Sequence, residues 1–290
     1  MEYSFFLGCL IPSFQPYVES ATRKVFGKLG IVIHDIEGAS CCPPTDIPRI
    51  ADELMWITLA ARNLALVEKL GYDVFAVCSG CFETLMEAKK ILKENKEVNE
   101  KVNQILSNYG LEYAGKVKVK NVLEVLYDDV GLKKLEETIV KPLTNIKICL
   151  QPGCKLRKFD ELNLPEKLKK IAEVIGCQVI PYKSERICCG FPTSFLNLDF
   201  AYRERSKVKL DEIKSAGADC IVLVCPACLN QLEMAQLKLK DEGLIYDIPC
   251  INLLELIAIA QGFSATSIGS IYRRIRPTKL INKIEGKTHG

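Results

Sequence analysis

One cysteine pattern occurs twice in the chain, and it restricts the possible folds more than any other feature. In each copy a single cysteine precedes an adjacent pair, and the pair precedes two cysteines separated by two residues. The gap before the pair is 31 residues in the first copy and 33 in the second, and the gap after it is 35 in both. Such matched spacing indicates a tandem duplication. The two sets are Cys9, Cys41, Cys42, Cys78 and Cys81, and Cys154, Cys188, Cys189, Cys225 and Cys228.

Short apolar runs alternate with amphipathic segments in both halves of the sequence. The runs predict strands near residues 3–8, 31–36, 73–77, 146–151, 178–182 and 220–224. The apolar spacing between them predicts helices near 50–70, 82–94, 164–175, 198–215 and 229–241. Strands that alternate with helices form parallel sheets covered on both faces. The predicted fold class is therefore α/β, with two duplicated Rossmann-like domains, each a parallel sheet flanked by helices.

The repeat divides the 290 residues into three parts. We expect an N-terminal domain over residues 1–145, in which the charged segment 95–145 is a helical insert or linker, and a C-terminal domain over 146–268. The remainder, 269–290, is a basic tail with apolar residues among its charges. A segment of this kind is typical of a docking arm that orders on a partner.

Composition and charge argue against several classes of protein. The formal net charge is only +3, which does not favour nucleic-acid binding. The sequence has no apolar run of about 18 residues, so no membrane span is expected. Its first residues lack the basic start of a signal peptide. We therefore expect a cytoplasmic protein in a reducing compartment, whose 14 cysteines serve metal or redox chemistry.

The positions of the cysteines suit metal ligands better than disulfides. Adjacent cysteines have Cα atoms about 3.8 Å apart, whereas a disulfide usually needs about 4.4–6.8 Å. Each CxxC motif lies at a predicted strand-to-helix turn, where the helix dipole stabilises thiolates. Five thiolates exceed the four ligands of one zinc ion and suit a polynuclear iron–sulfur centre. Zinc in one of the two sites is the alternative. The other four cysteines are expected to be buried structural thiols: Cys149, Cys177, Cys220 and Cys250.

Together the two motifs resemble the CCG-domain family, whose best-known member is the B subunit of heterodisulfide reductase from methanogens. The resemblance extends over about residues 3–261, although Pro43 stands where the second copy has Gly190. It implies that each five-cysteine set holds one non-cubane [4Fe-4S] cluster and that the two clusters face each other at the domain interface. It also implies that the chain is a catalytic subunit reducing CoM-S-S-CoB, the mixed disulfide of coenzyme M and coenzyme B, with each sulfur engaging one cluster.

The family also implies a complex of several different subunits. An iron–sulfur C subunit and a flavin-containing A subunit are the expected partners, and hydrogenase or formate dehydrogenase are further candidates. The sequence itself has no GxGxxG loop and no CxxCxxC run, so its electrons are expected to come from a partner. Two alternatives stay open: a heterodisulfide-reductase-like complex that acts on another sulfur substrate, and an electron-transfer module without a substrate of its own.

Basic residues beside the second set of cysteines are candidates for substrate binding. The two coenzymes carry sulfonate, phosphate and carboxylate groups, which require cations. Lys155 and Arg157 follow a motif cysteine and Arg186 precedes the second pair, so we predict that these three residues bind the substrate. His34, which precedes the first pair, is the candidate proton donor.

Overall fold

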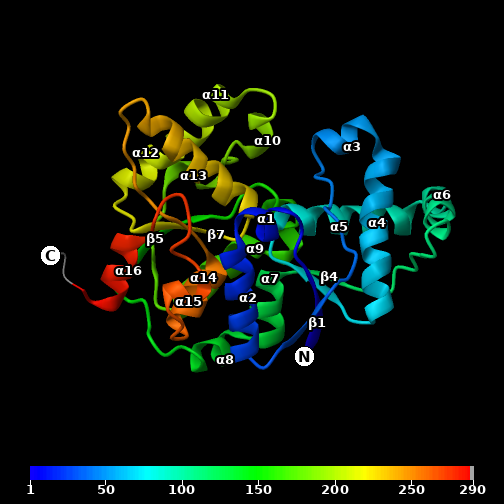
Figure 1. The fold of residues 1–290 in the computed structure, drawn as a ribbon, viewed down its shortest axis with the longest axis horizontal. Helices are drawn as coiled ribbons and strands as arrows, with labels where there is room; N and C mark the ends of the chain where they lie inside the picture. The colour runs from blue at the N-terminus through cyan, green and yellow to red at the C-terminus, as the bar shows by residue number, and fades with distance from the viewer. Residues whose placement is uncertain (288–290) are drawn as a thin grey trace.

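Two four-stranded parallel sheets form the centre of the molecule (Figure 1). The computed structural model describes residues 1–287, so the last three residues of the predicted tail lie outside the described part. The first sheet has the order β2-β1-β3-β4, formed by Val32–Asp35, Glu2–Phe6, Val74–Ala76 and Val119–Asn121. The second has the order β6-β5-β7-β8, formed by Gln178–Val179, Lys147–Gln151, Cys220–Leu223 and Cys250–Asn252. The same strand order in both halves confirms the predicted α/β fold with duplicated domains.

Helices cover the sheets, as expected for parallel strands. Those of the first half are α1 (Leu10–Phe14), α2 (Pro16–Lys28), α3 (Ile47–Ala51), α4 (Glu53–Leu70), α5 (Ser79–Glu94), α6 (Lys96–Ser107), α7 (Val122–Glu124) and α8 (Leu132–Glu137). Those of the second half are α9 (Leu164–Val174), α10 (Phe191–Ser194), α11 (Leu198–Phe200), α12 (Lys207–Ser215), α13 (Pro226–Lys240), α14 (Leu253–Ala260), α15 (Ala265–Ile268) and α16 (Thr278–Glu285). No helix in the described part of the chain combines the length and the hydropathy needed to cross a bilayer.

The central strands are apolar because both faces of each sheet are buried. In the first sheet the ring of Phe75 stacks on Phe5 and on Phe26, with ring centroids 4.8 and 4.6 Å apart. Phe5 and Phe75 are also register partners on β1 and β3. This stacking joins the two central strands to α2.

Residues 95–145 are not helical throughout, because they contain β4. This strand pairs with β3, and the chain then enters α7 through a capping box between Asn121 and Glu124. Asn252 and Glu255 form the same box after β8. A three-residue strand is too short to give a clear pattern in the sequence, so the segment reads as a charged helical stretch.

The two domains pack through equivalent helices. Helix α2 of the first domain packs against α14 of the second, and α9 of the second packs against α7 of the first. Helices α2 and α9 both follow the first strand of their sheet, and α7 and α14 both follow the last one. The interface is therefore approximately two-fold symmetric, and it brings corresponding loops of the two halves together.

Most of the tail folds back onto the second domain. The guanidinium of Arg273 is buried 2.9 Å from a carboxylate oxygen of Glu255 and donates to the carbonyl of Cys250. Leu280 and Ile284, one turn apart on α16, are buried as well. The tail is therefore held by its own domain, which differs from the docking arm that its charge predicts. The reason is the apolar side of α16, which finds a surface within the chain.

Candidate functional site

The ten motif cysteines lie on loops that leave the carboxyl ends of the strands. Cys9 follows β1, the first pair follows β2, and Cys78 follows β3 as the residue before α5. The second half repeats this order, with Cys225 directly before α13. All ten line one cavity of about 490 Å³ between the two domains. Ligand sites of open parallel sheets lie at this end of the strands.

The cysteine thiols form a nearly continuous chain across the cavity. Cys9 Sγ and Cys41 Sγ are 3.5 Å apart. Cys81 lies within hydrogen-bonding reach of Cys42 and Cys78, and Cys228 lies within reach of Cys189 and Cys225. Cys78 and Cys225 then meet across the domain interface. The two sets are thus separate groups that touch through their CxxC motifs.

Some thiols of each set ionise easily. Hydrogen bonding from Cys41 lowers the pKa of Cys9 to about 6, and hydrogen bonding from Cys154 lowers the pKa of Cys188. The pKa of Cys225 is lowered by Cys228 and Cys78. Thiolates rather than thiols are the ligands of metals. In each set at least one thiol therefore loses its proton more easily than an ordinary cysteine, whereas the pKa of its hydrogen-bonding neighbour, Cys41 or Cys154, is raised.

Two glycines allow the loops to approach this closely. A Cβ on Gly8, at φ +70°, would lie 2.7 Å from Cys81 Sγ. Gly190 follows the second cysteine pair at φ +100°, and its Cβ would lie 2.9 Å from the carbonyl oxygen of Ala201. In the first copy Pro43 takes this place, and its carbonyl accepts hydrogen bonds from Trp56 Nε1 and Thr84 Oγ1. Pro43, which replaces the glycine of the second copy, is thus held in place by two hydrogen bonds to its carbonyl.

The donor set fits an iron–sulfur cluster better than a single ion. Each domain supplies five thiols from three loops. A structural zinc site requires four ligands around one point, whereas a cluster spreads its thiolates over several irons. The close cysteines therefore favour iron–sulfur clusters.

The remaining four cysteines lie in the core, away from the cavity. Cys149, Cys220 and Cys250 belong to strands of the second sheet, and all four are buried. Burial raises the pKa of Cys177 to about 12 and that of Cys149 to about 11. These thiols stay protonated, as packing residues do.

Among the described residues, the only charged side chains on the wall of the cavity are Asp46 and Lys155, and they pair with each other. The Lys155 ammonium lies 3.1 Å from Asp46 and 2.7 Å from Glu83, a fully buried carboxylate on α5. Lys158 reaches the same carboxylate at 2.6 Å. The loop after Cys154 is thus clamped to the first domain by a buried ion pair. We call the pair Lys155–Glu83 the interdomain clamp.

Of the four residues predicted to bind substrate or donate a proton, only Lys155 reaches the cavity. Arg157 donates to the carbonyl of Gly153, and Arg186 is exposed to solvent. His34 belongs to β2, the edge strand of the first sheet, where its ring lies 2.8 Å from a Glu2 carboxylate oxygen and stacks on Tyr72. Its side chain is held there, and it contributes nothing to the wall of the cavity.

Sequence reasoning missed the apolar part of the site. Leu10, Ile47, Phe191 and Phe195 line the cavity beside the thiols. Ile47 follows the first cysteine pair, and the two phenylalanines follow the second. In both copies apolar residues follow within six positions of the cysteine pair, and this shared feature is the signal that could have identified them.

Comparison with known proteins agrees with this geometry. A family model described as a cysteine-rich domain (CCG) matches residues 3–86 and 148–233. The chain is 38% identical to a protein of Archaeoglobus profundus that is named as like the B subunit of heterodisulfide reductase, over 93% of this chain and 94% of that protein. It is 34% identical to the B subunit of the ferredoxin/F(420)H(2)-dependent CoB-CoM heterodisulfide reductase of Methanosarcina acetivorans, over 98% and 97%.

The fold also has a counterpart among solved structures. A hypothetical protein from Helicobacter pylori superposes with a TM-score of 0.76 at 14% identity, over 95% of this chain and 52% of that one. The names of the two relatives support an iron–sulfur reductase role within a complex of several subunits. The chain therefore belongs to the cysteine-rich CCG-domain family, and its similarity to heterodisulfide reductase B subunits extends over more than nine-tenths of both sequences.

Proposed function

We propose that this chain is the catalytic subunit that reduces the CoM-S-S-CoB heterodisulfide to the thiols of coenzyme M and coenzyme B. One observation carries the proposal: all ten motif cysteines line a single cavity, and the two sets meet at Cys78 and Cys225. Cleavage of a disulfide takes two electrons and two protons. A cavity bordered by two redox centres suits such a substrate because each sulfur has a centre beside it.

The ligands divide by domain in this proposal. Cys9, Cys41, Cys42, Cys78 and Cys81 hold one non-cubane [4Fe-4S] cluster, and Cys154, Cys188, Cys189, Cys225 and Cys228 hold the other. When bound, the clusters supply electrons one at a time. The chain contributes the apolar walls around Ile47 and Phe195, which exclude water and hold the carbon chains of the substrate.

The electron donor belongs to the same proposal. An iron–sulfur C subunit would deliver electrons, with a flavin-containing A subunit and a hydrogenase or formate dehydrogenase further upstream. We place the protein in the cytoplasm, because a reducing compartment keeps cysteines available as metal ligands.

The charges of the cavity favour a second candidate. Lys155 is the single cation that the described residues place on its wall, and Asp46 and Glu83 already neutralise it. Residues 1–287 thus leave no free cation in the cavity for a sulfonate or phosphate. This observation favours a less anionic sulfur substrate, acted on by a heterodisulfide-reductase-like complex with the same cysteine chemistry.

Anaerobic purification followed by spectroscopy tests both candidates. Iron, acid-labile sulfide and zinc are quantified first, and we expect about four irons per cysteine set and no zinc. Electron paramagnetic resonance spectra are then recorded with CoM-S-S-CoB and with an uncharged dialkyl disulfide. A new signal with the coenzyme disulfide alone supports the first candidate, and one with the uncharged disulfide alone supports the second. No signal with either would show that the chain only conducts electrons.

A further inference from the structure

A basic groove runs along the outer side of the second domain. Two cavities of about 360 and 760 Å³ share Tyr246, Asp247, Pro249, Lys279 and Leu280 as walls, so they form one continuous depression. It lies between the end of α13, the segment 245–249 and the tail. Its charged residues, which define what we call the basic groove, are Lys214, Lys240, Arg274, Arg276, Lys279, Lys283, Lys287, Asp219 and Asp247.

Positive charge is concentrated at this place. Seven cations face two carboxylates in the groove, an excess of five, whereas the whole chain has a net charge of only +3. The rest of the protein is therefore slightly acidic. Lys283 pairs with Asp219 at 2.7 Å, but Lys240, Arg276 and Lys279 have no ion-pair partner among residues 1–287. These three cations are available to a ligand.

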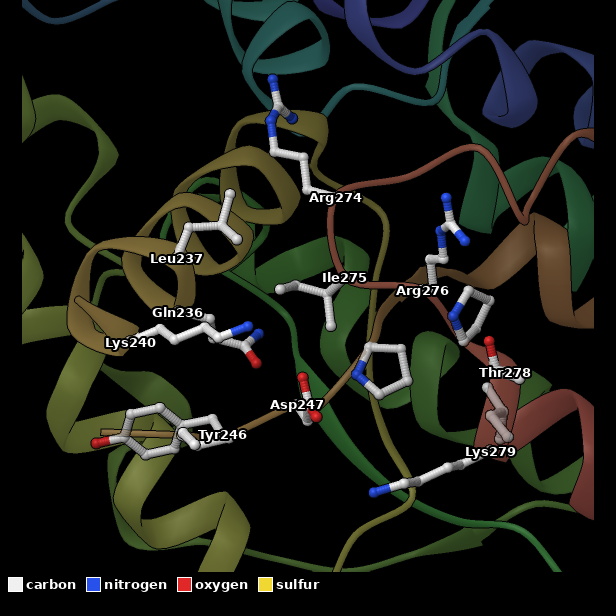
Figure 2. A pocket seen from close by; sticks show the side chains of 14 residues that line it. Gln236, Leu237, Lys240, Tyr246, Asp247, Arg274, Ile275, Arg276, Thr278 and Lys279 are labelled. Atoms are coloured by element: carbon white, nitrogen blue, oxygen red, sulfur yellow. The ribbon is translucent and has the colours of Figure 1, made fainter. Parts of the chain in front are cut away.

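The groove is preformed, because the tail that builds one of its walls is anchored. Arg273 is buried against Glu255, and Leu280 and Ile284 hold α16 against the domain. Figure 2 shows Lys240 and Lys279 approaching Asp247 from opposite sides, with Arg274 and Arg276 at the rim. A fixed arrangement of charges binds at a lower ordering cost than a flexible basic arm.

We propose that the basic groove binds an acidic, extended segment of a partner subunit of the reductase complex. This inference rests on the proposed function in one respect, namely that the chain works in a complex with other subunits. The excess of cations provides the charge complementarity. Asp247 and Asp219 interrupt the row of cations. An evenly charged polyanion such as a nucleic acid would be repelled there, whereas a peptide can place neutral residues opposite them.

The position of the groove agrees with a docking role. Asp219 directly precedes β7 and Pro249 directly precedes β8, so the groove borders the amino ends of these strands. The cysteine cavity lies at their carboxyl ends. A segment bound in the groove therefore holds the partner without covering the cavity.

Carbodiimide cross-linking of the native complex tests the contact directly. The reagent joins a lysine amine to a carboxylate in direct contact with it, with loss of one water. We expect mass spectrometry to find Lys240 or Lys279 joined to a peptide of a partner subunit rich in Asp and Glu. Cross-links confined to Asp247 or Asp219 of this chain would overturn the proposal.

A charge reversal provides the second test. We expect the triple variant Lys240→Glu, Arg276→Glu and Lys279→Glu to weaken partner binding about a hundredfold or more, because like charges at an interface repel strongly. The matched control reverses three exposed lysines of the first half: Lys133→Glu, Lys134→Glu and Lys141→Glu. The control is expected to keep wild-type affinity in binding measured at low and high salt. Equal affinity in both triple variants would refute the proposal.

Two further measurements separate this proposal from the proposed function. Iron content and disulfide cleavage driven by a chemical reductant need no partner, so the groove variant is expected to keep both. If wild-type protein lacks both while its cross-links to a partner persist, the proposed function fails and the groove assignment stands.

Discussion

At the scale of single residues, the loops around the cavity can pack closely because two of their residues are glycines, which have no Cβ atom. A methyl group on Gly8 would collide with Cys81 Sγ. A methyl group on Gly190 would collide with the carbonyl oxygen of Ala201, which lies in the helical turn before α12. Both residues adopt positive φ angles. Gly8 therefore allows the loop of Cys9 to pass close to Cys81, and Gly190 allows the second cysteine pair to pack against Ala201.

Substituting Gly190 tests this argument. We expect Gly190→Ala to lower the free energy of unfolding by roughly 1–3 kcal/mol, because positive φ strain and the contact at 2.9 Å act together. The matched control is Gly217→Ala, at φ +69° with nothing within 4 Å of its Cβ. Denaturant unfolding under anaerobic conditions measures both. A loss no larger than that of the control would show that the carbonyl of Ala201 moves away freely.

The division of cysteines between two centres is also tested at single residues. We expect Cys42→Ser to remove about half of the iron and Cys189→Ser to remove the other half, because each set belongs to one domain. Cys177→Ser, which changes a buried core thiol, is expected to keep all iron at a stability cost of about 1–3 kcal/mol. Iron and sulfide assays distinguish these outcomes. Loss of all iron in a folded Cys42→Ser protein would mean that ligands are shared between the domains.

At the scale of elements, buried ion pairs join segments that the sequence separates widely. The interdomain clamp connects the loop after β5 to α5, and Arg273 connects the tail to α13 and α14. Breaking a buried pair leaves an uncompensated charge, which costs more than the pair contributes when intact. Such pairs therefore fix which segments meet, even where they add little net stability.

A double-mutant cycle measures the coupling free energy between Lys155 and Glu83, the two residues of the interdomain clamp. Lys155→Met and Glu83→Gln are each expected to destabilise the protein by about 3–5 kcal/mol, with the lower end for Lys155→Met because Lys158 still neutralises Glu83. The double variant is expected to cost clearly less than the sum. The control cycle uses the exposed pair Lys101 and Glu97 on α6, where solvent screens the charges and the losses are expected to be additive. Additive losses at the clamp would contradict the ion pair.

The carboxylate of Glu233 makes stability depend on pH. Burial raises its pKa to about 7, although Arg273 and Arg274 oppose the shift and Glu255 adds to it. The unfolded chain ionises near the ordinary value of 4.5, so the folded state binds more protons between these values. The stabilisation is thus complete below about pH 4.5 and is lost as the pH rises through about 7.

Comparison with Glu233→Gln isolates this effect. We expect the stability of wild-type protein to fall relative to the variant between about pH 4.5 and 7, by an amount on the order of a few kcal/mol. Thermal unfolding across this range provides the measurement. Parallel pH profiles for the two proteins would show that Arg273 keeps Glu233 ionised throughout.

At the scale of the whole molecule, the duplicated sequence pattern predicts the two sheets and the meeting of the cysteines, but it does not predict the contacts between charged residues. The spacing of the ten cysteines and the apolar runs suffices for the two sheets and for the convergence of the thiols, because parallel strands end at one edge. The charged contacts could not be predicted in this way. Lys155 looks free in the sequence because Glu83, 72 residues away, lies in the other domain. The tail also looks mobile in the sequence, because Glu255, the ion-pair partner of its Arg273, lies outside the tail on α14.

Because the two domains are covalently connected, the cavity that they share stays assembled at low protein concentration. Between α8 and β5 the chain is fastened to the second domain, where the amides of Val140 and Lys141 donate to the carbonyl of Ala260. Two separate domains would have to find each other in solution, and their shared cavity would come apart at low concentration. A short connection instead gives each domain an effective concentration of its neighbour in the millimolar range. The cavity therefore forms at any expression level, with each half always present in equal number.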